Sequence, residues 1–290
     1  MAMRMYDIID KKKKGSELTP KEITYMVEGY VAGEIPDYQV SAFLMAVYYE
    51  GMSEKELSVF TDSMAKSGDM VDLSQIKGIK VDKHSTGGVG DKTTLAVAPL
   101  VAACGGRVAK MSGRGLGFTG GTIDKLESIP GMQTAISEER FFEIVNDIGL
   151  SVIGQSAEIA PADKKLYALR DVTATVDSIP LIAASIMSKK LASGSDKIVL
   201  DVTVGSGAFM KNIDDAICLA QRMVEIGENA GRQTVAILTN MDVPLGEAVG
   251  NDIEVVEAIE TLQGKGPEDF RQICVEFAAY MLYLGEIADL

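Results

Sequence analysis

The sequence has few of the side chains that bind transition metals or form disulfides. Its 290 residues include one histidine, His84, three cysteines and no tryptophan. The cysteines are far apart and form no Cys-x-x-Cys pair, so neither a zinc site nor a disulfide framework is expected. We expect Cys104, Cys218 and Cys274 to be small buried apolar residues.

Long apolar runs and basic charge are also scarce. The longest apolar run, Leu95–Cys104, contains Pro99 and is far shorter than the roughly 20 residues that a membrane helix needs. With 28 basic and 42 acidic residues the net charge is −14, which argues against binding to nucleic acid or anionic lipid. The N-terminus shows no secretory signal. We therefore predict a cytoplasmic protein with no nucleic-acid or membrane partner, which must hold any anion locally.

The length and the 47% hydrophobic content predict about two globular domains. The first of them is helical, because four helix-like segments fill the first 66 residues. Thr19-Pro20-Lys21-Glu22 is a capping box with proline at the first helical position, and Ser53-Glu54-Lys55-Glu56 repeats the box. Gly51 is placed to end the helix between them.

From residue 77 onward, short β-rich runs alternate with helical stretches, which is typical of an α/β domain. Two consecutive helices, Pro161–Val172 and Pro180–Ala192, interrupt this alternation. We therefore expect a small discontinuous helical domain packed on a larger α/β domain with a mainly parallel sheet, and an active-site cleft between them. The helical domain takes residues 1–66 and 162–194, and the α/β domain takes 67–161 and 195–290. The expected strands are Ile79–Val81, Val108–Lys110, Ser151–Ile153, Ile198–Val204 and Thr234–Leu238.

Ten of the 29 glycines fall between residues 87 and 121. The first cluster, Lys83-His84-Ser85-Thr86-Gly87-Gly88-Val89-Gly90-Asp91, comes directly after an expected strand and before a helix from about Thr93. This layout aims backbone N–H groups and a helix dipole at a phosphate. It is neither a Walker loop nor the Gly-x-Gly-x-x-Gly loop of dinucleotide binders. Taken alone, it is also compatible with a tight structural turn.

A second glycine loop, from Lys110 to Thr122, follows the next expected strand. Parallel strands bring their carboxyl ends side by side, so the two loops can converge on one anion. The alternative is surface charge with turn glycines. We expect Arg114 to anchor the loop rather than to touch a ligand. The polar side chains offered by the two loops are Lys83, Ser85, Thr94, Lys110, Ser112 and Thr122.

The two consecutive helices carry a cationic patch. Ser185 and Lys189 are four residues apart and share a face, as do Tyr167 and Arg170, three apart. A lysine on a buried helix needs a partner, so the spacing leaves both a structural ion pair and a ligand clamp open. Three apolar residues fit either the core, which composition favours, or the wall of a pocket for a flat ring: Leu116, Val176 and Phe209.

Segments 83–91 and 112–127 resemble the signature of the thymidine and pyrimidine-nucleoside phosphorylases, and the similarity continues through 161–173 and 185–190. The resemblance covers essentially the whole chain. It implies two domains that close on each other and a homodimer built through the helical domain. It also implies reversible phosphorolysis of uridine, thymidine or deoxyuridine to free base and (deoxy)ribose 1-phosphate, with inorganic phosphate as co-substrate and no required cofactor.

The resemblance also implies roles for individual residues. The implied phosphate ligands are Lys83, Ser85, Gly87, Gly88, Thr94, Lys110, Ser112 and Thr122. The implied catalytic ligands of the base are His84, Arg170 and Lys189, and its other neighbours are Tyr167, Ser185, Leu116, Val176 and Phe209. Some relatives hold a monovalent cation, which here implies a structural K⁺ near Gly90, Leu245, Ala248 and Glu257. Lys110 resembles the broad-specificity pyrimidine-nucleoside branch.

Three features depart from the resemblance. Phe118 stands where relatives commonly have histidine, and Thr203 stands where they commonly have lysine. Relatives continue into a further C-terminal domain, so we expect this chain to be a fragment or a truncated form. Two other functions remain open: a phosphoribosyltransferase of the anthranilate type, which would depend on a divalent metal, and a non-catalytic fragment that binds nucleoside or phosphate.

Overall fold

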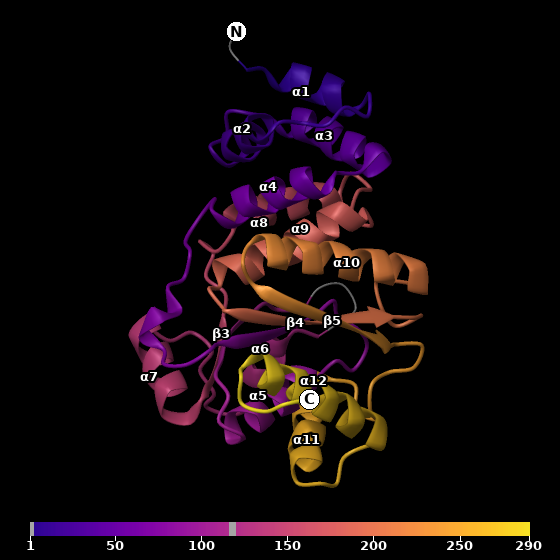
Figure 1. Cartoon of the computed structure of the whole chain (residues 1–290). Helices are drawn as coiled ribbons and strands as arrows, with labels where there is room; N and C mark the ends of the chain where they lie inside the picture. Colours follow the sequence, from indigo (N-terminus) through magenta and orange to yellow (C-terminus); the bar gives the residue numbers. More distant parts are fainter. Residues whose placement is uncertain (1–2, 116–119) are drawn as a thin grey trace. The chain divides into compact units, whose positions relative to one another are not determined.

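The computed structural model describes residues 3–115 and 120–290 and divides the chain into two compact units (Figure 1). The helical unit consists of Met1–Val71, Ser156–Gly194 and Gln221–Gly231. The α/β unit consists of Asp72–Gln155, Ser195–Ala220 and Arg232–Leu290.

The helical unit is a bundle in which α4 packs against α2, α8 and α9, while α1 packs on α3. The core of the bundle is formed by large side chains that are almost fully buried, among them Phe43 and Phe60. The four helices predicted in the first 66 residues are confirmed, and the two later helices begin and end within one residue of their predicted bounds. The helices are α1 (Met5–Lys12), α2 (Pro20–Val31), α3 (Asp37–Glu50), α4 (Glu54–Ala65), α8 (Pro161–Asp171) and α9 (Ile179–Ala192).

Both predicted capping boxes are present. The Glu22 carboxylate accepts from the Thr19 N–H at 2.7 Å, and the Glu56 carboxylate accepts from the Ser53 N–H at 2.8 Å. Gly51 ends α3 with φ of 67°, a conformation in which a side chain would be strained. Glu56 has a second role, because it forms a buried ion pair with Lys12 at 2.9 Å. The cap of α4 therefore also neutralises a charge in the core of the bundle.

The α/β unit contains two parallel sheets. One has the order β1-β4-β5 and the other pairs β2 with β3, so the prediction of parallel strands is confirmed, but the strands divide into two sheets rather than forming one. The strands are β1 (Val81–Ser85), β2 (Val108–Ser112), β3 (Leu150–Gly154), β4 (Lys197–Val204) and β5 (Gln233–Asn240).

Helices α5, α11 and α12 form one group in this unit: α5 packs against α11 and α12, and α12 contacts β1 and β4. Phe270 and Phe277 of α12 are fully buried in the core between these elements. The helices are α5 (Thr93–Ala103), α6 (Thr122–Glu127), α7 (Glu138–Ile148), α11 (Asn251–Leu262) and α12 (Glu268–Leu284), with α10 (Ile213–Asn229) contributing residues to both units and a short 3₁₀ turn, η1, at Leu73–Gln75.

Two sequence predictions about this unit are wrong. The first strand begins at Val81 rather than Ile79 and runs to Ser85, because residues 81–85 pair along their whole length with β4, a partner distant in sequence. Cys104 is exposed and Cys218 half-buried, so only Cys274 is a buried apolar residue. Burial raises the pKa of Cys274 to about 12, which keeps this thiol protonated at neutral pH.

The prediction of no membrane span agrees with the structure: over the described residues, every helix is too short or too polar to cross a bilayer.

Candidate functional site

The carboxyl ends of β1 and β2 lie at the same level. A parallel bridge pairs Lys80 with Arg107 at the start of the two strands. Three residues further along each strand, the amino group of Lys110 donates to the main-chain oxygen of Lys83. The same alignment brings Ser85 and Ser112 to the two strand ends. The two glycine loops therefore start side by side, as predicted from the sequence.

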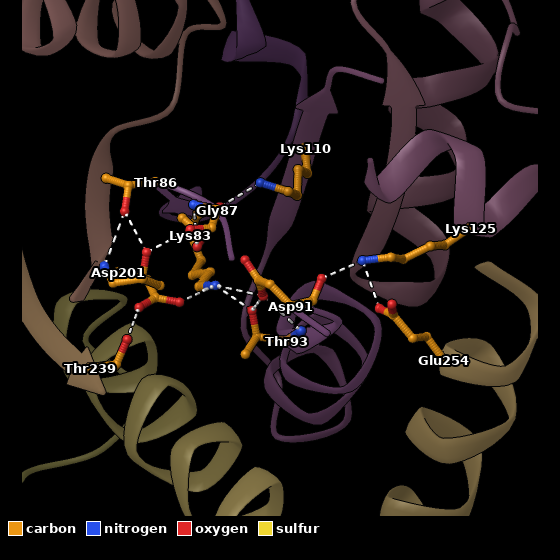
Figure 2. Close-up of polar contacts among 12 residues, drawn as sticks. Lys83, Thr86, Gly87, Asp91, Thr93, Lys110, Lys125, Asp201, Thr239 and Glu254 are labelled. Carbon is orange, nitrogen blue, oxygen red and sulfur yellow. Dashed lines mark hydrogen bonds and ion pairs between the residues drawn. The ribbon is translucent and has the colours of Figure 1, made fainter. Parts of the chain in front are cut away.

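Lys83 lies at the centre of a buried polar network (Figure 2). Its amino group donates to Asp201 of β4 at 2.9 Å and to the Thr93 hydroxyl, and lies 4.0 Å from Asp91. The Thr93 hydroxyl in turn donates to Asp91 at 2.6 Å, and the Thr239 hydroxyl donates to Asp201 at 2.7 Å. Only 3% of the Lys83 side chain is exposed, so solvent does not compensate its charge. The carboxylates of Asp201 and Asp91 compensate it inside the unit.

Lys83 and Asp91 stabilise each other's charge, whereas burial and the nearby Asp91 charge raise the pKa of Asp201 despite its ion pair with Lys83. Burial alone would lower the pKa of Lys83, but the negative charges of Asp201 and Asp91 outweigh it and raise that pKa. Burial alone would raise the pKa of Asp91, but the Lys83 charge and the hydroxyls of Ser85 and Thr93 hold it well below its usual range. Lys83 and Asp91 are therefore both ionised at neutral pH.

Lys110 has the same kind of environment. Its side chain is buried and pairs with Asp82 at 3.1 Å. Both cations expected at the phosphate site thus have a carboxylate partner within the α/β unit. The four expected hydroxyl ligands are half-buried and lie at the ends of β1 and β2 and in the first turns of α5 and α6: Ser85, Ser112, Thr94 and Thr122.

Close packing explains part of the glycine pattern in the first loop. A Cβ at Gly88 would lie 2.6 Å from the Met241 side chain, and one at Gly90, where φ is +76°, would lie 2.7 Å from the Leu245 oxygen. Gly87 is held differently: its N–H donates to the Ser85 hydroxyl at 3.0 Å, and its oxygen accepts from the Thr203 hydroxyl at 2.6 Å. Thr203, one of the departures from the family pattern, therefore fixes the loop.

In the second loop, Arg114 pairs with Glu127 at 2.7 Å and with Asp124 at 3.0 Å. It thus anchors the loop as predicted. Leu116 and Phe118 lie outside the described residues.

In the helical unit, Arg170 is buried and organises the segment between α8 and α9. Its guanidinium donates to the main-chain oxygens of Thr175, Val176 and Leu181 at 3.2, 2.6 and 3.0 Å. It also lies over the Tyr167 ring, 5.7 Å from the centroid, so these two predicted neighbours are in contact.

Lys189 forms an ion pair, and its role as a structural group or as a ligand clamp stays open. Its amino group donates to Asp163 at 2.5 Å and to the Ser185 hydroxyl at 3.1 Å. The other oxygen of Asp163, Oδ1, is buried and has no hydrogen-bond partner among the described residues. A ligand with an N–H group would satisfy such an acceptor.

The remaining predicted site residues lie at the surface of their units. His84 on β1 and Val176 are half-buried. Phe209, which follows β4, is 38% exposed, so the interpretation of Phe209 as a core residue is wrong.

The four expected K⁺ ligands do converge, but around a lysine. The amino group of Lys92 donates to the oxygens of Leu245 and Ala248 at 2.6 and 2.9 Å and pairs with Glu257. The main-chain oxygen of Leu245 also lies against Gly90. A lysine ammonium therefore already bonds to these oxygens, and the expectation of K⁺ among them stays a prediction. Within the described residues, no group of three or more histidine, cysteine or acidic side chains could hold a metal ion.

Sequence reasoning missed four residues of these networks: Lys92, Thr93, Asp163 and Asp201. Asp163 lies on α8, the helix before the one that carries Lys189. The sequence therefore contained a carboxylate on the same pair of helices as the cationic patch. Lys92 and Asp201 have no local signal, because their partners are fixed by tertiary structure, whereas Thr93 also bonds to Asp91, two residues before it.

Comparisons with known proteins agree with the family resemblance. Residues 77–290 match the glycosyl transferase family, a/b domain, and residues 6–68 match the glycosyl transferase family, helical bundle domain. Over 287 residues the chain is 60% identical to a pyrimidine-nucleoside phosphorylase of Geobacillus stearothermophilus and 58% identical to one of Staphylococcus aureus. Each match covers 99% of this chain and 66% of the relative, so the chain spans just under two thirds of their length.

The fold is also similar to that of a solved structure, the anthranilate phosphoribosyltransferase of Thermus thermophilus. The TM-score is 0.77 with 17% sequence identity, and the match covers 97% of this chain and 90% of that one. At this identity the comparison supports the fold alone.

The Lys83 network predicts how stability depends on pH. Asp91 stays ionised in the folded chain at pH values where an unfolded aspartate, with a pKa of about 3.9, takes up a proton. Its contribution is therefore complete above about pH 5 and is lost as the pH falls. Between pH 5 and pH 3 the free energy of unfolding should fall for both proteins. We expect the fall to be about 1 kcal/mol larger for the wild type than for Asp91→Asn.

Urea unfolding across this pH range measures the difference. Asp252→Asn, which removes an exposed carboxylate of α11, is the control and should follow the wild type. Equal pH dependence of Asp91→Asn and wild type would contradict the network.

Proposed function

Because the chain belongs to the glycosyl transferase family that combines a helical bundle domain with an a/b domain, we propose that it is a pyrimidine-nucleoside phosphorylase of broad specificity. It would cleave uridine, thymidine or deoxyuridine with inorganic phosphate to give free base and (deoxy)ribose 1-phosphate. One observation carries the proposal. The glycine loops of β1 and β2 begin side by side, joined by the contact between Lys83 and Lys110, in a chain 60% identical to proteins of that name.

The α/β unit is proposed to bind phosphate. The ligands are the hydroxyls at the two strand ends and helix starts, the main chain at Gly87 and Gly88, and the charges of Lys83 and Lys110. Helix N-termini and glycine-loop N–H groups are suited to anions, and Lys83 and Lys110 add positive charge at the same strands although each also pairs with a carboxylate. A phosphate oxygen attacks C1′ of the sugar, so the protein need not supply a carboxylate nucleophile.

The helical unit is proposed to bind the base through Arg170, Ser185, Lys189 and Tyr167. Breaking the N-glycosidic bond leaves the electron pair on the departing base, so its carbonyl oxygens gain negative charge. Cationic donors fixed in advance stabilise that charge more than they stabilise the bound substrate. The contacts of Arg170 and Lys189 with their own unit hold both groups in place, and His84 is proposed as a further donor to the base.

The proposal also covers the domains, the assembly, the location and the remaining base contacts of the protein. Residues 1–66 with 162–194, and 67–161 with 195–290, act as the two functional domains. The protein works as a cytoplasmic homodimer formed through the helical domain and requires no cofactor besides the phosphate co-substrate. Val176 and Phe209 contact the base.

Incubation with uridine or thymidine tests the function directly. We expect free uracil or thymine only when phosphate is present, and the same rate with and without EDTA, because the nucleophile needs no metal. Dependence on a divalent metal, with a phosphoribosyl diphosphate as substrate, would instead indicate the anthranilate-type reaction. Thermal stabilisation by nucleoside or phosphate without release of base would indicate a binding protein.

The role of Lys83 can be separated from its contribution to stability. Lys83→Met alone leaves Asp201 as an unpaired buried charge and should cost about 3–5 kcal/mol of stability. The double variant Lys83→Met/Asp201→Asn removes both charges of this pair but leaves Asp91 without Lys83, so we expect it to regain part of the stability and to release no base. Denaturant unfolding and the release assay measure the two effects. Wild-type turnover by the folded double variant would refute Lys83 as a phosphate ligand.

The role of Lys189 has a matched control on the neighbouring helix. We expect Lys189→Met to lower kcat by roughly 10²–10³, the usual cost of one donor to a developing negative charge. Lys164→Met, an exposed lysine of α8, should leave kcat unchanged. Thermal unfolding of both variants checks that the difference does not arise from misfolding. An unchanged kcat in folded Lys189→Met would show that the ion pair with Asp163 is purely structural.

A further inference from the structure

Lys92 is a fully buried lysine directly after the first glycine loop, at the start of α5. Its amino group donates to the main-chain oxygens of Leu245 and Ala248 and forms an ion pair with one oxygen of Glu257. An ammonium has three N–H donors and no acceptor, so these three oxygens match its hydrogen-bonding capacity.

The groups that surround the Lys92 ammonium lie close to it. The second oxygen of Glu257 accepts from the main-chain N–H groups of Glu247 and Ala248 at 2.9 and 3.0 Å. A Cβ on Gly246, where φ is +67°, would lie 3.0 Å from the Lys92 nitrogen and would collide with Glu257. The Phe270 ring lies 5.2 Å from the same nitrogen. Residues 245–248, α11 and α12 therefore all contact one amino group.

Main-chain carbonyl oxygens and carboxylates are also the ligands that bind a hard cation such as K⁺ in proteins. The family resemblance places a monovalent cation among these residues, yet the structure has a lysine ammonium bonded to the same oxygens. A second positive charge there would be repelled by Lys92 and would have to compete for oxygens that already accept hydrogen bonds. The oxygens of Leu245, Ala248 and Glu257 surround one cation, and that cation is the ammonium group of Lys92.

We propose that Lys92 replaces a bound monovalent cation and makes the folding of the α/β unit independent of K⁺. The tethered charge holds residues 245–248 in place, and this segment supports the glycine loop: the Leu245 N–H donates to the Val89 oxygen at 3.1 Å, and the Leu245 oxygen lies against Gly90. The inference concerns folding, so it does not depend on the proposed catalytic function.

Thermal unfolding of the wild type and of Lys92→Thr tests the proposal, in 0.1 M KCl and in 0.1 M choline chloride. The wild type should have the same Tm in both salts. Lys92→Thr leaves the carbonyls and Glu257 without their cation, so its Tm should fall in choline and recover with K⁺, by about 5 °C at a saturating concentration. The recovery should saturate, as binding at one site requires.

Two controls separate cation binding from a general effect of salt. Lys92→Met removes the charge but keeps most of the side chain's volume between residues 245–248 and Glu257. Its Tm should therefore fall equally in both salts. Lys12→Thr breaks the buried pair with Glu56 in the helical unit, where the lysine bonds to that carboxylate rather than to main-chain oxygens. It should be destabilised without specific recovery by K⁺.

Saturable stabilisation of the wild type by K⁺ over choline would overturn the proposal, because the site would then be taking an ion beside Lys92. Equal Tm values of Lys92→Thr in the two salts would also overturn it. If Lys92→Thr is unfolded in choline, refolding upon addition of K⁺ supports the proposal, and failure to refold in either salt counts against it. None of these outcomes depends on measuring catalysis.

Discussion

The α/β unit depends on the ion pair between Lys83 and Asp201. It joins the middle of β1 to β4 below the first glycine loop, and its side chains are 3% exposed. Two charges buried this deeply are favourable only when their remaining hydrogen-bonding groups are satisfied. Thr93, Thr239 and Asp91 satisfy them, so the start of α5 and the end of β5 are fixed to the same pair.

Among the described residues of this unit, positive charge is buried at four further places, each with its own carboxylate; one is Lys80, which pairs with Asp196 at 2.9 Å. Lys92 pairs with Glu257, Lys110 with Asp82, and Lys125 with Glu254. Lys125 also donates to the main-chain oxygen of Asp91 at 2.5 Å, as Figure 2 shows, so it is joined to the network around Lys83. An acidic protein thereby keeps fixed cations near the two loops without exposing them to solvent.

Much of the fold was predictable because its signals are local. Capping boxes and a proline at a first helical turn each depend on neighbours within a few positions, and the structure confirms the helices that they predict. The family could also be predicted, because the glycine segments are distinctive. The predicted first strand began two residues early and ended four residues early, because the pairing with β4 runs from Val81 to Ser85.

The partners of the site residues could not be predicted in this way. Lys83 and Asp201 are 118 positions apart, and Lys92 and Leu245 are 153 apart. No spacing rule applies over such distances, so the sequence indicated which residues matter but not how their charges are compensated. The catalytic and ligand roles of the predicted residues stay predictions, because they concern bound molecules.

The division of the strands into two sheets has a consequence for how this site could change in evolution. At their amino ends β1 and β2 are joined by a backbone bridge, whereas near their carboxyl ends the described contact is made by the Lys110 side chain. The Lys110 side chain therefore joins the two strands at the point where the glycine loops begin. Because the main-chain ladders β1-β4-β5 and β2-β3 do not include this side chain, the residue at position 110 can vary among descendants without a change in either ladder's hydrogen bonds.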